Sequence, residues 1–209
     1  MVEVWWTTDQ RDESLLSDDE HARLDRFVLA KTRREYVTAR SLVRTTLSRY
    51  AEVDPRSWTF RDNAWGRPEI SPPSPLRFNV SHADGIVVCA VTRDRELGVD
   101  VESLDRVTTN VAEDFFAPCE VAALRALPEA AQRERFLEYW TLKESYIKAR
   151  GMGLALALDE FWFRFDPLVL EASNGDDPQR WRFEQLRLPN HLIAVCVERG
   201  DGPIVLREA

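Results

Sequence analysis

With 209 residues, the chain is long enough for one large domain or two small ones, and its 44% hydrophobic and 31% charged residues are typical of a globular protein. No apolar run approaches the roughly 20 residues that cross a bilayer, and a net charge of −8 argues against nucleic acid as a bulk partner. The first ten residues lack the basic region and apolar core of a secretory signal. We therefore expect a cytoplasmic protein with neither a membrane nor a nucleic-acid partner.

The three cysteines are odd in number and scattered along the chain. Cys89 and Cys196 lie in apolar, strand-like runs, which predicts buried thiols. No spacing of Cys and His indicates a zinc site.

The first fifty residues predict a strand followed by helices. Val2–Thr7 is β-branched and aromatic, as strands are. Ser17 and Glu20 form a Ser-x-x-Glu capping box, which predicts a helix that begins near Asp18. Helical periodicity continues towards residue 50, too far for an ordinary helix, so we expect a break near Ala30.

One part of this helical pattern is basic, although the chain as a whole is acidic. Residues 31–44 carry five cations against the single acid Glu35: Lys31, Arg33, Arg34, Arg40 and Arg44. Two interpretations stay open, a solvated helix face and an anion-binding site.

The middle of the chain predicts a sheet. Residues 58–70 read as one weak strand, and a β-rich stretch follows at 76–102, in which 78–82 leads into a turn and strands occupy 86–91 and 97–102. Asp100 and Glu102 alternate with apolar residues, so both project from one face of the last of these strands. Like charges there are unfavourable unless a cation, a metal or solvent separates them. A strand end that faces water stays an alternative.

The second half predicts further helices, a longer helix and more strands. Helical segments cover residues 107–130, and residues 136–153 form a helix that ends at Gly151. On this helix Trp140, Glu144 and Lys148 lie along one side. Two interpretations stay open: functional groups on this side, or an ordinary exposed ion pair between Glu144 and Lys148. Strands are predicted at 161–165, 168–171, 181–188 and 191–198. Residues 84–91 resemble residues 190–197 in pattern, which is compatible with two related halves.

Three separated motifs occur in a fixed order: Gly66-Arg67-Pro68 with FNVSH at 78–82, GVDVE at 98–102, and WTLKESYIKARG at 140–151. Together they resemble the motifs of the surfactin-type 4′-phosphopantetheinyl transferases, over roughly residues 15–165. Each motif alone is modest, but their combination is highly specific.

This resemblance implies an α+β fold, a pseudo-dimer of two similar α/β halves with the active site between them. We expect the N-terminal half to comprise residues 1–104, with the basic helix, the Gly-Arg-Pro loop and the FNVSH and GVDVE strands. The C-terminal half would comprise residues 105–209, with the WTLKESYIK helix and a C-terminal sheet. A pseudo-dimer of this kind is expected to be a monomer.

The resemblance also assigns roles to residues. Asp100, Glu102 and Glu144 would hold Mg²⁺. The residues expected to contact coenzyme A are Arg40, Arg44, Arg67, Ser81, His82 and Lys148, with His82 at the 3′-phosphate and Lys148 at the diphosphate. Asp100, Glu144 and Lys148 are the expected catalytic residues, with Glu144 as the base, directly or through a water. Arg67 stands where the family often has lysine, and Ala39 where many members have glycine.

The implied function is transfer of 4′-phosphopantetheine from coenzyme A to a serine of an acyl or peptidyl carrier protein, which converts the apo carrier to the holo form. Two alternatives remain. One is a Mg²⁺-dependent phosphohydrolase of coenzyme A-like nucleotides, with water as the acceptor. The other is a non-catalytic module that binds a nucleotide or a carrier protein.

Overall fold

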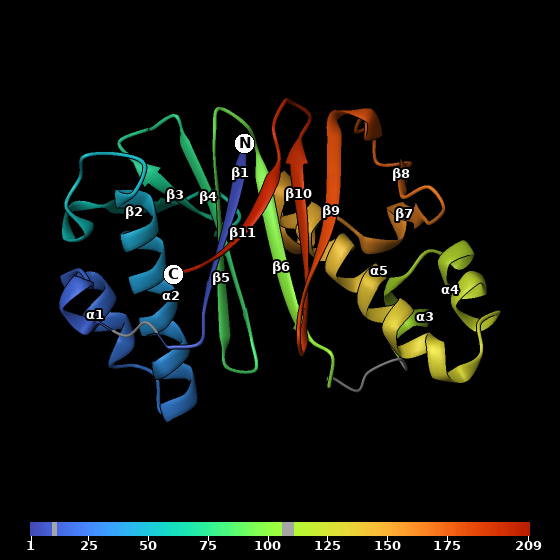
Figure 1. Ribbon diagram of the computed structural model, residues 1–209, viewed down its shortest axis with the longest axis horizontal. Helices are drawn as coiled ribbons and strands as arrows, with labels where there is room; N and C mark the ends of the chain where they lie inside the picture. The colour runs from blue at the N-terminus through green and yellow to red at the C-terminus, as the bar shows by residue number, and fades with distance from the viewer. Residues whose placement is uncertain (10–11, 106–110) are drawn as a thin grey trace.

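The computed structural model describes residues 1–9, 12–105 and 111–209 and shows a mixed α+β fold, as predicted (Figure 1). The helices are α1 Asp18–Leu24, α2 Ala30–Ser48, α3 Ala112–Phe115, α4 Pro118–Arg125 and α5 Glu129–Arg150, with 3₁₀ turns η1 Glu13–Leu15, η2 Pro55–Ser57, η3 Gly153–Ala155, η4 Leu158–Glu160 and η5 Pro178–Arg180. The strands are β1 Val2–Thr7, β2 Thr59–Asp62, β3 Pro68–Ser71, β4 Leu76–Ala83, β5 Ile86–Arg93, β6 Leu97–Ser103, β7 Phe161–Arg164, β8 Val169–Ala172, β9 Trp181–Leu188, β10 His191–Glu198 and β11 Ile204–Glu208. Residues 107–110 of the predicted helical segment lie outside the described ranges. None of the helices within those ranges combines the length and the apolar character that a bilayer crossing requires.

The predicted helix boundaries near the N-terminus are confirmed. Ser17 Oγ accepts a hydrogen bond from the Glu20 backbone N–H at 3.3 Å, and Glu20 Oε2 accepts one from the Ser17 N–H at 2.9 Å. This capping box starts α1, and the helical pattern breaks before α2 begins at Ala30.

Other boundaries differ from the prediction. Helix α5 begins at Glu129, seven residues before the predicted start, because the Ala, Glu, Gln and Arg residues after Pro128 are good helix formers. It ends at Gly151 with a left-handed φ of 63°, as predicted. Residues 58–70 form the hairpin β2–β3 rather than one strand. The short strand β11 was not predicted, since its partner β1 lies at the other end of the chain.

Two sheets carry most of the strands. Their orders are β11-β1-β5-β4 and β6-β10-β9, and the two hairpins β2–β3 and β7–β8 are separate. All neighbouring strands are antiparallel except β1 and β11, which are parallel. The division into halves at residues 104 and 105 stays a prediction, and strand pairing crosses it twice, at β6–β10 and at β1–β11.

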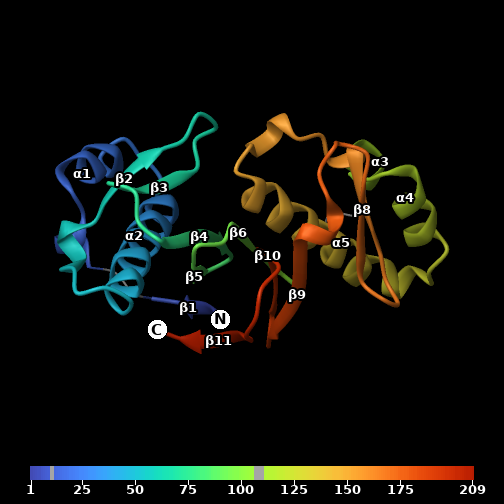
Figure 2. The same ribbon diagram turned by 90° about the horizontal axis from the view of Figure 1, so that it is seen from above.

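Each sheet buries one face against the other sheet and the opposite face against a long helix (Figures 1 and 2). Helix α2 covers β4 and β5, and helix α5 covers β6 and β10. The alternation along β5 and β10 buries Cys89 and Cys196, as predicted. Strands β4 and β6 lie next to each other, so the two long helices flank the junction between the sheets.

A buried ion pair fixes α5 in the C-terminal half. Lys143 Nζ lies 2.7 Å from Glu120 Oε2 of α4 and donates to the carbonyl oxygens of Leu158 at 2.8 Å and Phe161 at 2.7 Å. Glu120 also accepts from two backbone N–H groups, those of Ala117 and Phe163. Burial lowers the pKa of the Lys143 ammonium and raises the pKa of the Glu120 carboxyl, while their mutual attraction opposes both shifts.

We expect Lys143→Met to lower the free energy of unfolding by about 3–5 kcal/mol, because it leaves the Glu120 carboxylate buried without a counter-ion. Arg187→Met is the control, since Arg187 is about half exposed and its ion pairs, with Glu134 and Glu138, lie at the surface of α5. That variant should lose no more than about 1 kcal/mol. Urea unfolding measures both values, and equal losses would show that the Lys143 pair is no more important than a surface pair.

Candidate active site

Helix α5 lies directly against strand β6 at Gly98. A Cβ atom on Gly98 would lie 2.1 Å from the carbonyl oxygen of Ser145 and 2.4 Å from the backbone nitrogen of Ala149. No residue with a side chain fits there unless the helix moves. This close approach brings the last turns of α5 over the face of β6 that carries Asp100 and Glu102.

Ser81, Asp100 and Lys148 meet in one hydrogen-bonded cluster, although they come from β4, β6 and α5. Lys148 Nζ donates to Asp100 Oδ1 at 2.7 Å and to Ser81 Oγ at 2.9 Å, and Ser81 Oγ donates to Asp100 Oδ1 at 3.0 Å. Asp100 is 5% exposed, so this carboxylate does not lie at a strand end that faces water. Lys148 supplies the positive charge that a buried carboxylate requires.

The three predicted metal ligands have unequal surroundings. Within the described ranges, no group of three or more His, Cys, Asp or Glu side chains is arranged to hold a metal ion. Asp100 Oδ2, however, is buried and has no hydrogen-bond partner among the described residues. An unpaired carboxylate oxygen suits a hard cation such as Mg²⁺, so Asp100 fits the predicted role. Glu102 lies two residues along the same strand face, and Glu144 lines a cavity with Lys148.

The turn between β2 and β3 is fixed to the end of α5 by Asn63 and Arg67. Asn63 Nδ2 donates to the Gly151 carbonyl at 2.9 Å, while its Oδ1 accepts from the backbone N–H groups of Trp65 at 2.8 Å and Arg67 at 3.0 Å. Arg67 Nη1 donates to the Ala149 carbonyl at 3.1 Å. The turn and the segment after α5 therefore line one cavity, and they face each other in Figure 2.

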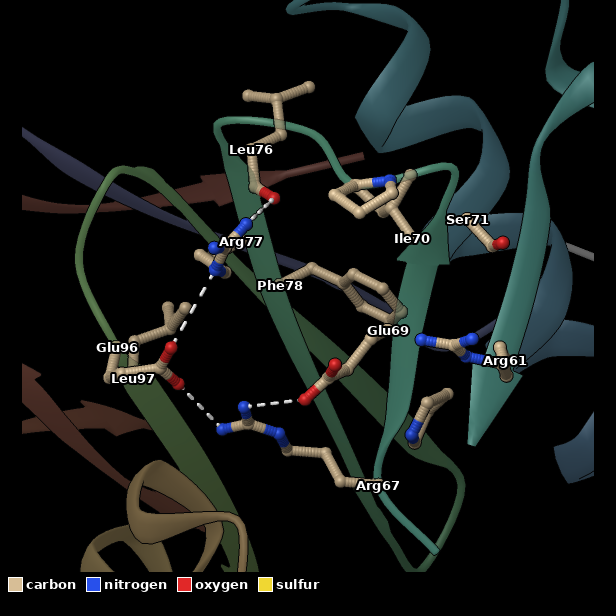
Figure 3. A pocket seen from close by; sticks show the side chains of 12 residues that line it. Arg61, Arg67, Glu69, Ile70, Ser71, Leu76, Arg77, Phe78, Glu96 and Leu97 are labelled. Atoms are coloured by element: carbon tan, nitrogen blue, oxygen red, sulfur yellow. Dashed lines mark hydrogen bonds and ion pairs between the residues drawn. The ribbon is translucent and has the colours of Figure 1, made fainter. Parts of the chain in front are cut away.

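Arg67 itself is held by two carboxylates (Figure 3). Nη1 lies 2.8 Å from Glu96 and Nη2 lies 2.9 Å from Glu69. Burial lowers the pKa of the Arg67 guanidinium, but these two carboxylates more than offset it, so the pKa lies above the ordinary value. Contact between Arg67 and coenzyme A stays a prediction, and it would require Arg67 to share its donors with these partners.

The two predicted arginines of α2 have different surroundings. Arg40 lines a cavity of about 320 Å³ together with His82, which is exposed. Arg44 is 1% exposed and donates to Glu20 and to the carbonyl oxygens of Pro55, Arg56 and Trp58. Its donors are thus used inside the protein, and the structure gives Arg44 a structural role in place of the predicted contact with coenzyme A. The basic part of α2 is both a solvated face and a cavity wall.

Two neighbouring cavities connect these groups. The cavity with Arg40 and His82 also includes Pro68 and Val80. The same two residues line a second cavity of about 280 Å³, which contains Glu144 and Lys148. The two cavities therefore adjoin at Pro68 and Val80, with Arg40 in one and Lys148 in the other, and we call this pair of cavities the groove.

Sequence reasoning missed several residues that build this site. Asn79 Oδ1 accepts from the Val99 N–H at 2.9 Å and so joins β4 to β6. Asn79 and Gly98 lie inside motifs that the sequence displays, but their roles depend on which elements meet. Asn63 belongs to no such motif, and Glu20 was predicted only as a helix cap.

Comparison with known proteins gives the family. Residues 96–196 match the 4′-phosphopantetheinyl transferase superfamily, and residues 6–94 match the N-terminal part of 4′-phosphopantetheinyl transferases. The 4′-phosphopantetheinyl transferase HetI of a Nostoc species is 34% identical over 90% of this chain and 80% of its own. A 4′-phosphopantetheinyl transferase of Bacillus subtilis is 32% identical over 77% of this chain and 72% of its own, and Sfp of Bacillus subtilis strain 168 is 28% identical over 91% and 85%.

The chain belongs to the 4′-phosphopantetheinyl transferase superfamily. In this phosphopantetheinyl transferase, the motif residues Ser81, Asp100 and Lys148 come together at the junction of the sheets. The assignment of each residue to metal, coenzyme A or catalysis stays a prediction.

We expect Gly98→Ala to destabilise the transferase by about 1–3 kcal/mol or more, because the added methyl group overlaps the backbone of α5. Displacement of α5 should also separate Lys148 from Asp100 and reduce activity. Gly200→Ala is the control, since its Cβ would meet the Arg95 side chain, 3.0 Å from Nη1 and 3.2 Å from Cδ, rather than backbone atoms. Thermal unfolding and a transfer assay measure the two effects. A Gly98→Ala protein as stable and active as Gly200→Ala would rule out this close contact.

Proposed function

We propose that the protein transfers the 4′-phosphopantetheine group of coenzyme A to a serine hydroxyl of an acyl or peptidyl carrier protein. The observation that carries the proposal is the groove formed by the two cavities that share Pro68 and Val80. Coenzyme A carries a 3′-phosphate and a diphosphate, so it needs cations at two separated places. Arg40 and His82 would face the 3′-phosphate, and Lys148 would face the diphosphate.

Asp100, Glu102 and Glu144 would hold Mg²⁺ in this proposal. Oxygen ligands from carboxylates suit this ion, which when bound would neutralise negative charge on the diphosphate. The buried Oδ2 of Asp100, which lacks a hydrogen-bond partner among the described residues, supports this role. Ser81, whose hydroxyl already contacts Lys148 at 2.9 Å, would be a further contact for the phosphates.

The chain's own residues would act on the proton and on the charge of the leaving group. The serine oxygen forms a bond to the phosphorus next to pantetheine, while the bond from that phosphorus to the bridging oxygen breaks and adenosine 3′,5′-bisphosphate leaves. The Glu144 carboxylate takes the serine proton, directly or through a water. The Lys148 ammonium compensates the negative charge that develops on the leaving phosphate.

The proposal includes two similar halves with the active site between them, in a monomeric, cytoplasmic enzyme. A repeated ion pair supports the similarity. In α1 the third residue, Glu20, accepts from the backbone N–H of the capping residue and pairs with a buried cation of the following long helix, Arg44. In α4 Glu120 does the same with Ala117 and with Lys143 of α5. In both cases backbone carbonyls further along the chain take the remaining donors of the cation.

The test is an intact-mass assay of apo acyl and peptidyl carrier proteins with coenzyme A and Mg²⁺. A carrier that gains one phosphopantetheine group supports the proposal. Phosphopantetheine released into solution would instead indicate a phosphohydrolase, and coenzyme A bound without turnover would indicate a binding module.

We expect Glu144→Gln to slow transfer at least about 100-fold, the usual lower contribution of a general base, with little change in thermal midpoint. Glu134→Gln on the same helix is the control, because Glu134 is about half exposed and pairs with Arg187 rather than facing the groove. Equal rates for the two variants would remove Glu144 from the reaction.

A further inference from the structure

The carboxylate of Glu20 is fixed at three points inside the N-terminal half. Glu20 Oε2 accepts from the Ser17 N–H at 2.9 Å and lies 2.7 Å from Nη2 and 3.2 Å from Nε of Arg44. Arg44 cannot follow a moving partner, since its Nη1 is bound to backbone carbonyls. One oxygen of Glu20 is thereby immobilised, and the other, Oε1, faces Arg40.

Arg40 lies one helical turn before Arg44, and Glu20 holds it from the side. Glu20 Oε1 lies 3.4 Å from Arg40 Nε, the nitrogen nearest the backbone. The guanidinium carbon of Arg40 lies 5.4 Å from the centre of the Tyr36 ring and 6.0 Å from that of Phe60, which restrict it further. Among the described residues, the structure records no hydrogen-bond partner for the two terminal nitrogens of Arg40.

This arrangement leaves the outer edge of the guanidinium available to a ligand. Arg40 lies between two cavities, one that contains His82 and one that contains Glu20, Tyr36 and Phe60. A guanidinium edge matches two oxygens of a phosphate in a bidentate contact. A flexible arginine would have to lose side-chain freedom on binding, whereas an arginine held by Glu20 has already lost it.

We propose that Glu20 is a positioning residue that holds Arg40 for a terminal phosphate and so makes the enzyme select coenzyme A over dephospho-coenzyme A. The inference rests on the proposed function, in which Arg40 faces the 3′-phosphate. Glu20 does not touch the ligand. It fixes Nε of Arg40, and the two terminal nitrogens bind.

The direction in which phosphate affinity changes when Glu20 is neutralised distinguishes a positioning role from simple charge repulsion. A carboxylate near an anion site repels the anion, so Coulomb interactions alone predict tighter phosphate binding when Glu20 becomes neutral. Positioning predicts weaker binding. Glu35→Gln is the matched control, because Glu35 lines the same cavity and pairs with Lys31 at 3.8 Å rather than with Arg40.

Calorimetric titration of the full chain with coenzyme A and with dephospho-coenzyme A, in Mg²⁺, gives two dissociation constants for each variant. Their ratio measures selection for the 3′-phosphate. We expect Glu20→Gln to reduce the wild-type ratio about tenfold, towards the ratio of Arg40→Ala, and Glu35→Gln to leave it unchanged or raise it. A structural role alone would change both constants equally and keep the ratio.

A ratio for Glu20→Gln at or above that of wild type would overturn the positioning role. A wild-type ratio of one, or a ratio that Arg40→Ala does not change, would instead overturn the placement of Arg40 at the 3′-phosphate. Glu20→Gln leaves Arg44 buried without a counter-ion and can destabilise the fold. The double variant Glu20→Gln/Arg44→Met removes both buried charges and carries the same expectation.

Discussion

The contact between the backbone of α5 and Gly98 of β6 is the constraint on which the rest of the site depends. Because position 98 has no side chain, the helix lies against the strand and Lys148 reaches Asp100 at 2.7 Å. The turn between β2 and β3 is then fixed to the end of the same helix by Asn63. Strand β4 is joined to β6 through Asn79 and supplies Ser81. One close packing contact therefore brings together three motifs that are far apart in the sequence.

The charges in this junction show how the fold tolerates a buried carboxylate at Asp100. Two carboxylates on one face of β6 predicted an electrostatic penalty, and Lys148 offsets it at Asp100. Without Lys148 the Asp100 carboxylate would be buried with no counter-ion, which costs about 3–5 kcal/mol. The value of Lys148 to the fold is thus mainly that it prevents this cost, and the same ammonium is the group proposed to face the diphosphate.

Local features could be predicted from the sequence, and most long-range ones could not. The capping box at Ser17, the cap at Gly151 and the strands β4 to β6 depend on neighbouring residues, and the structure confirms them. Arg40 and Arg44 share one helical face, so periodicity could not tell that one lines a cavity while the other is buried among carbonyls. That distinction depends on η2, which follows α2 and covers Arg44. The pairing of β1 with β11 likewise depends on residues at opposite ends of the chain.

The most direct measurement of the site is the melting temperature of wild type and Asp100→Asn with Mg²⁺ and coenzyme A, added separately and together. Ligands that bind the native state raise the melting temperature, so wild type should rise most with both. We expect Asp100→Asn to lose the part of the rise that requires Mg²⁺, while Asp105→Asn, an exposed change nearby on the chain, keeps it. A full Mg²⁺-dependent rise in Asp100→Asn would contradict a metal and coenzyme A site at this junction.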